Sequence, residues 1–215
     1  MNKLSKAIRL AADYKSFRAL LSFRYSGYIF QNGWFESLKT RSAVNASGEP
    51  IPWITYPSIR FLGERLPARA ALFEFGSGNS TLYFARNIRS VVSVEHDREW
   101  FERIRLQLPR NAEIVYAEIS SNGAYSRAAA DSKKKYDIIF VDGRDRVNCI
   151  RNSFRSLKSD GVVVLDDAER LEYRDGITFL ERRRFKRIDF WGIAPGVMEE
   201  KCTAVLYRTK NCLNI

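Results

Sequence analysis

Cysteine and histidine are both scarce in this chain of 215 residues. The three cysteines, Cys149, Cys202 and Cys212, form no Cys-x-x-Cys pair, and His96 is the only histidine. So few and so dispersed, these residues predict neither a disulfide framework nor a zinc site.

Long apolar runs are absent as well. None approaches the ~20 residues that span a bilayer, and the first residues lack a continuous apolar signal core. We therefore expect a cytoplasmic protein. Hydrophobic residues make up 45% of the chain and charged residues 28%, which is ordinary for a globular protein. The length suits one domain with a sizeable core and an added helical segment.

Acidic residues are in deficit, and the formal net charge is +11. Such a balance is compatible with nucleic acid, an anionic membrane surface or an acidic substrate as partner. The basic residues are spread along the chain, and the runs 133–135 and 182–184 are typical of solvated loops or helix ends. The charge alone does not establish nucleic-acid binding.

The most specific pattern is the stretch from Glu74 to Thr81, Glu-Phe-Gly-Ser-Gly-Asn-Ser-Thr. It follows a short apolar run, 71–75, that predicts a strand, and it precedes a helical pattern. A glycine-rich turn lets the backbone approach a ligand closely. The next predicted strand, 91–95, ends at Glu95, whose carboxylate suits the two hydroxyls of a ribose. Together these features predict a nucleoside-cofactor site.

The end of the loop indicates which cofactor is bound. The dinucleotide pattern Gly-x-Gly-x-x-Gly uses its last glycine for tight packing beside a pyrophosphate. Here Thr81 stands in that place, and Glu74 would repel a pyrophosphate but could hold an ammonium. At these residues the chain resembles the class I S-adenosylmethionine-dependent methyltransferases, whose first motif reads acidic-x-Gly-x-Gly-x-x-Thr. The resemblance covers residues 52–208; the alternative is a glycine-rich turn in an unrelated doubly wound fold.

The resemblance implies a Rossmann-like α/β fold. It consists of a doubly wound, mostly parallel seven-stranded sheet with a C-terminal antiparallel hairpin, preceded here by an N-terminal helical extension. We expect the extension and a loop over 1–50 and the methyltransferase domain over 51–215. Alternating strand and helix patterns agree with this fold. The expected strands are 71–75, 91–95, 113–117, 136–141, 162–165, 185–191 and 203–208.

Helical patterns also occur outside the sheet. Apolar spacing over residues 3–30 predicts one or two amphipathic helices, which pack on the domain, lie on a membrane or pair with another chain. Packing on the domain is the commonest outcome. We further expect helices over 58–66, with Ser58 as N-cap, and over 98–108, 147–157 and 176–183.

The resemblance also implies the cofactor site. Glu74 would hold the methionine ammonium, Glu95 the ribose hydroxyls, and His96, Asp97 and Glu118 would lie beside the adenine. The full set is Glu74, Gly76, Ser77, Gly78, Asn79, Ser80, Thr81, Glu95, His96, Asp97, Glu118 and Asp142.

Carboxylates at the strand ends are the candidate catalytic groups. His96 falls on the cofactor side, so the remaining candidates for a catalytic base are Asp142, Asp166 and Asp167. Their surroundings resemble the metal-dependent catechol and caffeoyl-coenzyme A type O-methyltransferases. There an Asp and an Asp-Asn pair bind a divalent ion that acidifies the acceptor hydroxyl.

This chain departs from that metal-binding pattern in two ways. It has Asp-Asp in place of Asp-Asn, and two arginines, Arg144 and Arg146, follow Asp142 closely. We therefore expect no metal, with Mg²⁺ on the three aspartates as an alternative. A further alternative has Asp166 and Asp167 capping the following helix.

The candidate substrate-binding residues are Arg144, Arg146, Arg170, Tyr173 and Tyr56. The first four are expected on one rim, and an arginine fork suits carboxylate or phosphate. Ion pairing of the arginines with nearby aspartates is an equal alternative. Tyr56, with Trp53 and Thr55, precedes the first strand, where related enzymes cover the cofactor; core packing is the alternative.

We expect O-methylation of a small-molecule or glycan acceptor, anionic if the arginines bind it. The alternatives are an RNA methyltransferase and a non-catalytic nucleoside-binding scaffold. Against RNA, no Asn/Asp-Pro-Pro-Tyr motif follows the fourth strand, and no cysteine is placed for pyrimidine methylation. The chain also resembles bacterial methyltransferase-like proteins of uncertain substrate. The oligomeric state stays open.

Overall fold

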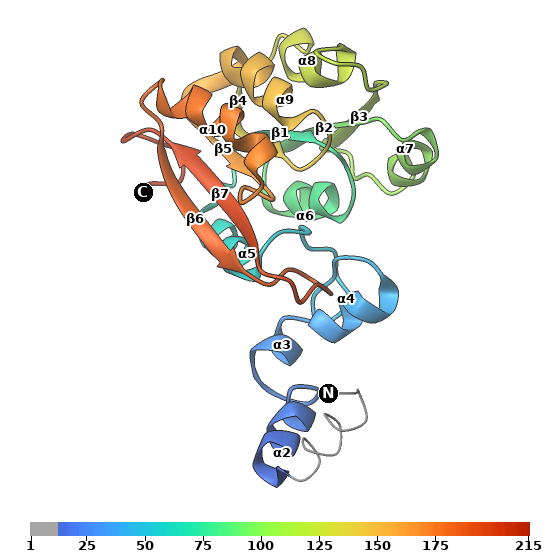
Figure 1. The fold of residues 1–215 in the computed structure, drawn as a ribbon. Coiled ribbons are helices and arrows are strands. Elements are labelled where there is room, and N and C mark those ends of the chain that lie inside the picture. Colours follow the sequence, from blue (N-terminus) through green and yellow to red (C-terminus); the bar gives the residue numbers. More distant parts are fainter. Residues whose placement is uncertain (1–12) are drawn as a thin grey trace.

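One seven-stranded sheet organises the chain (Figure 1). The structure, a computed structural model, describes residues 13–215. The strand order is β3-β2-β1-β4-β5-β7-β6; the first five strands are mutually parallel, and β7 runs antiparallel to both of its neighbours. The strands are β1 (Ala71–Phe75), β2 (Ser90–Glu95), β3 (Ala112–Tyr116), β4 (Tyr136–Val141), β5 (Leu157–Leu165), β6 (Lys186–Gly192) and β7 (Lys201–Tyr207). The predicted fold class is confirmed.

Helices flank the sheet and extend beyond it in Figure 1. The α-helices are α2 (Tyr14–Ser22), α3 (Gly27–Gln31), α4 (Trp34–Thr40), α5 (Tyr56–Arg65), α6 (Asn79–Asn87), α7 (Arg98–Arg105), α8 (Ala124–Asp131), α9 (Arg146–Ser153) and α10 (Arg174–Glu181). Two short 3₁₀ turns are η1 (Phe154–Ser156) and η2 (Leu171–Tyr173). Within residues 13–215, no helix is both long and apolar enough to cross a membrane.

Alternation along the central strands divides the core between the two faces of the sheet. Phe73 and Phe75 of β1 pack in one cluster with residues of α8, α9 and α10. Leu72, which precedes them, packs in a second cluster with α5 and α6. Because β1 and β4 are covered on both faces, they read in the sequence as nearly continuous apolar runs. For that reason the bounds predicted for these two strands, 71–75 and 136–141, are confirmed without change.

The predicted start of β5 is wrong. The strand begins at Leu157, five residues before the expected 162, and the preceding helix ends at Ser153 rather than at 157. The pairing of β5 with β4 changes register between Tyr136 and Ile138, so that Tyr136 faces Leu157 and Ile138 faces Val162. The polar residues 159–161 therefore form an irregularity inside the strand, although by composition they resemble a turn.

Helix α5 also begins earlier than expected. Thr55 is its N-cap, and Pro57 occupies the first turn, where a missing N–H costs no hydrogen bond. Ser58, the predicted N-cap, lies inside the helix and donates its hydroxyl to the carbonyl of Thr55 at 2.7 Å. The prediction for Ser58 is wrong because proline fixed the start two residues upstream.

The described part of the predicted amphipathic segment forms α2 and α3; its first residues, up to residue 12, lie outside the described part. None of the nine residues of α2 is buried, so its expected packing on the domain does not occur. In Figure 1 α2 stands apart from the sheet. From α3 onward the chain contacts the body: Tyr28 packs on Tyr56, and Trp34, Ala43 and Ile51 form a cluster with Tyr56. The domain boundary at residue 50 stays a prediction.

Truncating a central strand should destabilise the fold far more than truncating the surface. Leu72→Ala removes a fully buried side chain, and we expect it to lower the free energy of unfolding by about 2–5 kcal/mol. Leu106→Ala is the matched control, because Leu106 is 84% exposed, and it should change stability by roughly 0.5 kcal/mol or less. Urea denaturation followed by circular dichroism measures both. Equal effects would contradict the assignment of Leu72 to the core.

Candidate functional site

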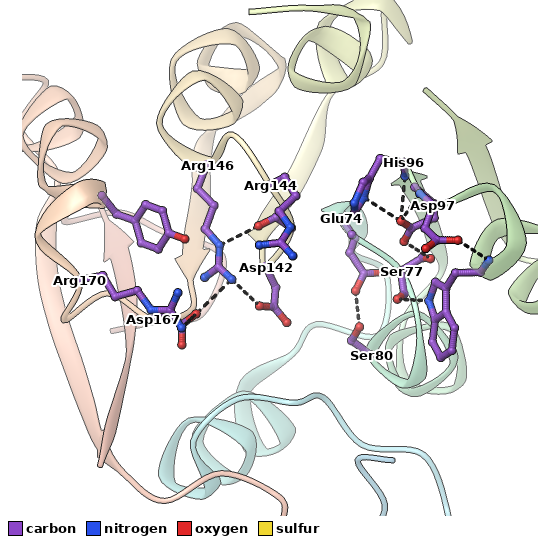
Figure 2. Close-up of a pocket in the computed structure, with 15 residues that line it drawn as sticks. Glu74, Ser77, Ser80, His96, Asp97, Asp142, Arg144, Arg146, Asp167 and Arg170 are labelled. Carbon is purple, nitrogen blue, oxygen red and sulfur yellow. Dashed lines mark hydrogen bonds and ion pairs between the residues drawn. The ribbon is translucent and has the colours of Figure 1, made fainter. Parts of the chain in front are cut away.

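A cavity of about 440 Å³ opens where the parallel strands β1, β2 and β4 end (Figure 2). Carboxyl ends of parallel strands meet at one edge, which is where open α/β sheets bind ligands. The predicted residues that line it are Glu74, Gly76, Ser77, Ser80, Glu95, His96, Asp97, Asp142, Arg144, Arg146, Asp167, Arg170 and Tyr173. Trp100 and Gly143 also line it and were not predicted.

The glycine loop after β1 is shaped by backbone that other residues rarely adopt. Gly76 has φ of 100° and Gly78 has φ of 154°. A Cβ atom on Gly76 would lie 3.4 Å from the backbone of Asp142 and Gly143, an ordinary contact, so the positive φ and not the space calls for glycine here. The indole N–H of Trp100 donates to the carbonyl of Ser77 at 2.9 Å and holds the loop against α7.

Glu74 is buried beneath this loop. Its carboxylate accepts hydrogen bonds from the hydroxyls of Ser80, Thr81 (2.5 Å) and Ser93 (2.6 Å). Burial raises the pKa of Glu74 to about 7, against the three hydroxyl donors, which lower it. Glu74 thus links the first turn of α6 to the sheet, and the hydroxyl of Thr81 is one of the donors in this link.

Glu95, at the end of β2, presents a carboxylate fixed by its own loop. One oxygen accepts the backbone N–H groups of His96 and Asp97 at 2.8 and 2.9 Å, and the other accepts the hydroxyl of Ser77 at 2.7 Å. The ring nitrogen Nδ1 of His96 lies 2.9 Å from the first oxygen. Asp97 caps α7 by accepting the N–H of Trp100. These contacts orient the end of β2 toward the cavity.

Four of the predicted cofactor residues do not line the cavity, namely Gly78, Asn79, Thr81 and Glu118. Asn79 turns the other way and donates its amide to Ser42 and Ala43 at 2.8 and 2.7 Å. Glu118 is exposed in the loop after β3. Their role in cofactor binding stays a prediction.

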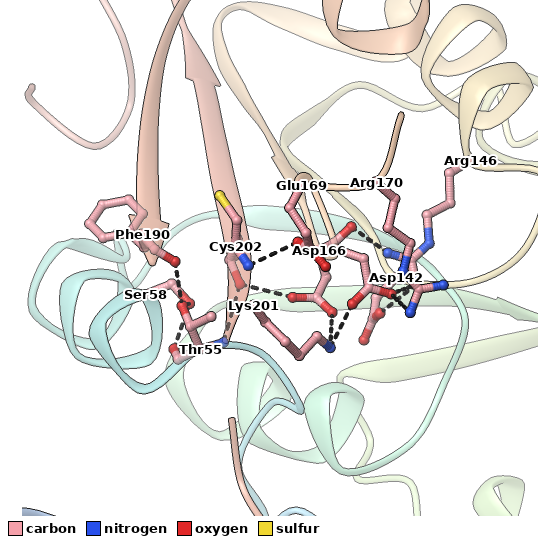
Figure 3. A network of polar contacts seen from close by, with 12 residues as sticks. Thr55, Ser58, Asp142, Arg146, Asp166, Glu169, Arg170, Phe190, Lys201 and Cys202 are labelled. Atoms are coloured by element: carbon pink, nitrogen blue, oxygen red, sulfur yellow. Dashed lines mark hydrogen bonds and ion pairs between the residues drawn. The ribbon is translucent and has the colours of Figure 1, made fainter. Parts of the chain in front are cut away.

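Beside the cavity, three aspartates and three cations form a network of ion pairs, which is buried except at Arg170 (Figure 3). The ammonium of Lys201 lies 2.9 Å from Asp166 and 2.7 Å from Asp167. The guanidinium of Arg146 lies 3.1 Å from Asp142 and 3.2 Å from Asp167. The guanidinium of Arg170 lies 3.0 Å from Asp167.

The network separates the pKa values of its members. Burial, together with the charge of Asp166, raises the pKa of Asp142 well above its usual range. Burial also acts to raise the pKa of Asp167, but the hydrogen bond and charge of Lys201, with those of Arg146, hold it below its usual value. For Lys201 burial acts to lower the pKa, and the two carboxylates raise it overall, so Lys201 is a cation at neutral pH.

A second cavity, of about 590 Å³, adjoins the first. Asp142, Asp167 and Arg170 line both. Trp53 and Lys201 belong to the second cavity alone. Its other lining residues are Asp166, Glu169, Val197, Glu199 and Glu200. Two spaces that meet at a shared carboxylate can hold two molecules side by side.

Comparison with known families decides the class of protein. Residues 73–168, which include the glycine loop, Glu95 and the Asp142 and Asp166 strand ends, match the family model of a methyltransferase domain. Residues 73–168 therefore form a methyltransferase domain. The family implies S-adenosylmethionine as the methyl donor. Comparison with curated protein sequences finds no match.

Solved structures agree with this methyltransferase fold. A candidate O-methyltransferase from Klebsiella pneumoniae is 17% identical with a TM-score of 0.57, and the match covers 92% of this chain and 96% of that one. The precorrin-6y C5,15-methyltransferase of Geobacter metallireducens is 18% identical with a TM-score of 0.56, over 71% and 88% of the two chains. An rRNA methylase from Streptococcus thermophilus is 14% identical with a TM-score of 0.54, over 73% and 99%. At these identities the likeness shows the fold and leaves the acceptor open.

The aspartates considered as metal ligands are already bonded to cations in the methyltransferase. Lys201 and Arg146 lie between the carboxylates that would have to converge on Mg²⁺. In the described part of the chain, no group of three or more His, Cys, Asp or Glu is arranged to hold a metal ion. Neither Asp166 nor Asp167 caps the following helix, because the N-cap of η2 is Arg170 and the N-cap of α10 is Tyr173.

Two predicted substrate residues have other surroundings. Arg146 is buried, and its side chain donates to the carbonyls of Gly143 and Asp166 as well as to Asp142, so it holds the site together. Tyr56 is buried in the cluster with Trp34 and lines neither cavity. Arg144 is exposed, and Tyr173 lies under the guanidinium of Arg146 at 4.9 Å.

The sequence interpretation missed Trp100 and Lys201. Trp100 could have been found, because it lies one turn into the helix that follows Glu95. Lys201 gave no local signal; it begins β7 and reaches Asp166 only because β7 lies antiparallel beside β5.

The buried carboxyl of Glu74 should make stability depend on pH. A pKa raised from 4.5 to about 7 means that the folded state holds the proton over a range where the unfolded state has released it. The stabilising contribution of Glu74 is thus full below about pH 4.5 and is lost as the pH rises through about 7. Glu74→Gln is neutral throughout, so from pH 5 to 8 it should gain about 1–3 kcal/mol relative to the wild type.

Urea denaturation of both proteins at the two pH values measures this difference. Glu118→Gln, at an exposed position, is the control and should show no such gain. A constant difference between Glu74→Gln and the wild type would show that the Glu74 carboxyl titrates normally.

Proposed function

We propose that the protein transfers the methyl group of S-adenosylmethionine to a hydroxyl oxygen of a small-molecule or glycan acceptor. The observation that carries the proposal is the pair of adjoining cavities that share Asp142, Asp167 and Arg170. The donor occupies the first cavity, beside the glycine loop, and the acceptor occupies the second. The two then meet at Asp142.

The chemistry of the first cavity fits this donor. S-adenosylmethionine carries an ammonium, a sulfonium and a ribose but no phosphate, and Glu95 and Asp142 present carboxylates to the cavity. Glu95 accepts the ribose hydroxyls, displacing the hydroxyl of Ser77, while the backbone bonds to its other oxygen keep it oriented. Trp100 and His96 flank the nucleoside, and Glu74 supports the loop from below.

On the acceptor side, Asp142 takes the proton. The bound donor supplies an electrophilic methyl group, and an acceptor hydroxyl must lose its proton as the new O–C bond forms. Asp142 lines both cavities, and its raised pKa makes it a stronger base than an ordinary carboxylate.

Lys201 holds the acceptor oxygen. An ammonium has three N–H donors, and two of those of Lys201 face Asp166 and Asp167. The third is free to donate to the acceptor oxygen as negative charge develops on it. Lys201 thereby stabilises the developing negative charge on the acceptor oxygen. A divalent ion has this role in the metal-dependent catechol and caffeoyl-coenzyme A type O-methyltransferases.

A second candidate function, RNA methylation, has the net charge of +11 in its favour. The second cavity is unfavourable to it, because six carboxylates line that cavity against Arg170 and Lys201. A phosphate backbone would meet net negative charge there. An anionic acceptor would have to rely on Arg144, since Arg146 and Arg170 already pair with aspartates of the network.

Replacing the ribose-binding carboxylate should weaken donor binding. We expect Glu95→Ala to lower the affinity for S-adenosylmethionine about ten- to a hundredfold, because two hydrogen bonds to a charged group are lost. Isothermal titration calorimetry measures this, with Glu99→Ala, an exposed neighbour in α7, as the control. Unchanged affinity in Glu95→Ala would remove Glu95 from the donor site.

The pH dependence of turnover should report on Asp142. Activity is first sought on a panel of hydroxylated metabolites and sugar nucleotides, with Mg²⁺ and with chelator, and we expect the two conditions to agree. The rate should fall on the acid side as Asp142 takes a proton, at a higher pH than for an ordinary carboxyl. Asp142→Asn should lose about 100-fold or more in kcat.

Lys201→Met should move that acid limb to higher pH, by on the order of one pH unit, because Lys201 lowers the pKa of Asp142. Lys210→Met, at an exposed position, is the control. A Lys201→Met enzyme that is slower at every pH with an unmoved limb would indicate a purely structural lysine. Donor binding without turnover on the whole panel, in the wild type, would favour the scaffold alternative.

A further inference from the structure

Apolar side chains are exposed along the segment of residues 14–30, which contains α2 and α3 and is called here the amphipathic segment. Globular proteins keep few large apolar groups so close together in water. The exposed ones are Tyr14 (66%), Phe17 (40%), Leu20 (46%), Leu21 (49%), Phe23 (43%), Tyr25 (71%), Tyr28 (51%) and Phe30 (45%).

In α2 these groups form a stripe. Tyr14, Phe17 and Leu21 follow one another at spacings of three and four residues, which places them along one face of a helix, with Leu20 beside them. Lys15 and Arg18 fall on the remaining circumference. The helix is thus amphipathic although no part of the described chain covers its apolar face.

Charge is concentrated in the same part of the chain. The first 30 residues contain six basic side chains and a single acidic one, Asp13, and Asp13 is engaged as the N-cap of α2. This region therefore supplies a large share of the net charge of +11.

We propose that the amphipathic segment docks the protein on an anionic lipid bilayer, with α2 in the plane of the interface. An apolar stripe with aromatic rings enters the boundary between headgroups and acyl chains, while lysine and arginine meet the anionic headgroups. This partner satisfies both faces of α2 at once. A nucleic acid would bind the cations and leave the stripe in water. A second copy of the chain would cover the stripe and leave the basic face in water.

The connection to the rest of the protein is suited to such a role. The ring of Tyr28 in α3 packs edge-on against Tyr56 of the domain, with centroids 6.0 Å apart, and the guanidinium of Arg24 lies 5.9 Å from the ring of Phe35. These contacts join the amphipathic segment to the domain through its second half and leave α2 exposed. Docking through α2 would hold the methyltransferase at a membrane surface without any spanning helix.

Sedimentation of the full chain with vesicles tests the proposal. We expect wild-type protein to sediment with vesicles of phosphatidylcholine and phosphatidylglycerol, to stay in solution with phosphatidylcholine alone, and to be released by high salt. The double variant F17S/L21S and the double variant K15Q/R18Q should each lower the partition coefficient about tenfold or more. L106S/L171S removes two exposed leucines outside the segment and should bind like the wild type.

All four proteins should keep the same circular dichroism spectrum and the same affinity for S-adenosylmethionine, because the substituted positions are exposed and outside both cavities. Equal binding to neutral vesicles, or binding that F17S/L21S leaves unchanged, overturns the proposal. The proposal is also overturned if the wild type binds no vesicles and light scattering shows a dimer that only the F17S/L21S variant converts to monomers. Retention on RNA that depends on Lys15 and Arg18 but not on Phe17 and Leu21, again without vesicle binding, also overturns it.

Discussion

The balance of buried charge at the carboxyl edge of the sheet is the constraint on which the site depends. Asp142 ends β4, Asp166 and Asp167 follow β5, and their charges are balanced by Arg146 at the start of α9, Lys201 at the start of β7 and Arg170 before η2. Removing one partner of a buried ion pair typically costs about 3–5 kcal/mol, because the remaining charge is left uncompensated. The same charged side chains therefore hold β4, β5, α9 and β7 at this edge and line the two cavities. The geometry of the acceptor side depends on the C-terminal hairpin as much as on the cofactor loop.

Local patterns were sufficient where the structure itself is local. Strands β1 and β4 are buried on both faces, so their apolar runs could be read with correct bounds, and the loop from Glu74 to Thr81 indicated the fold and the donor together. Where two distant segments interact, local patterns are much weaker signals. The irregularity in β5 results from its pairing with β4, and the inward turn of Tyr56 results from packing with Trp34.

Lys201 is intermediate between a residue that a local pattern predicts and one that only the folded structure reveals. The hairpin was predicted, and a strand antiparallel to β5 must begin where β5 ends. Leu165 pairs with Ala204, so a residue three positions before Ala204 lies just beyond the end of β5, beside Asp166. The cation could therefore have been inferred from topology, although not from any motif. This position adds Lys201 to the ion pairs that the sequence indicated only between the arginines and the aspartates.

Asp142 connects the network to the proposed reaction. In the protein alone, burial and Asp166 hold its pKa high, which opposes ionisation. A cationic donor in the first cavity adds a positive charge beside Asp142, which favours the carboxylate and so prepares the base before transfer. Once the methyl group has moved, that positive charge is gone and the pKa of Asp142 rises again, so the carboxyl keeps the proton it has taken. The carboxylate of Asp142 is thus favoured while the cationic donor is bound, and its proton is retained once the methyl group has moved. The charges of Arg146 and Lys201 lower the pKa of Asp142 throughout.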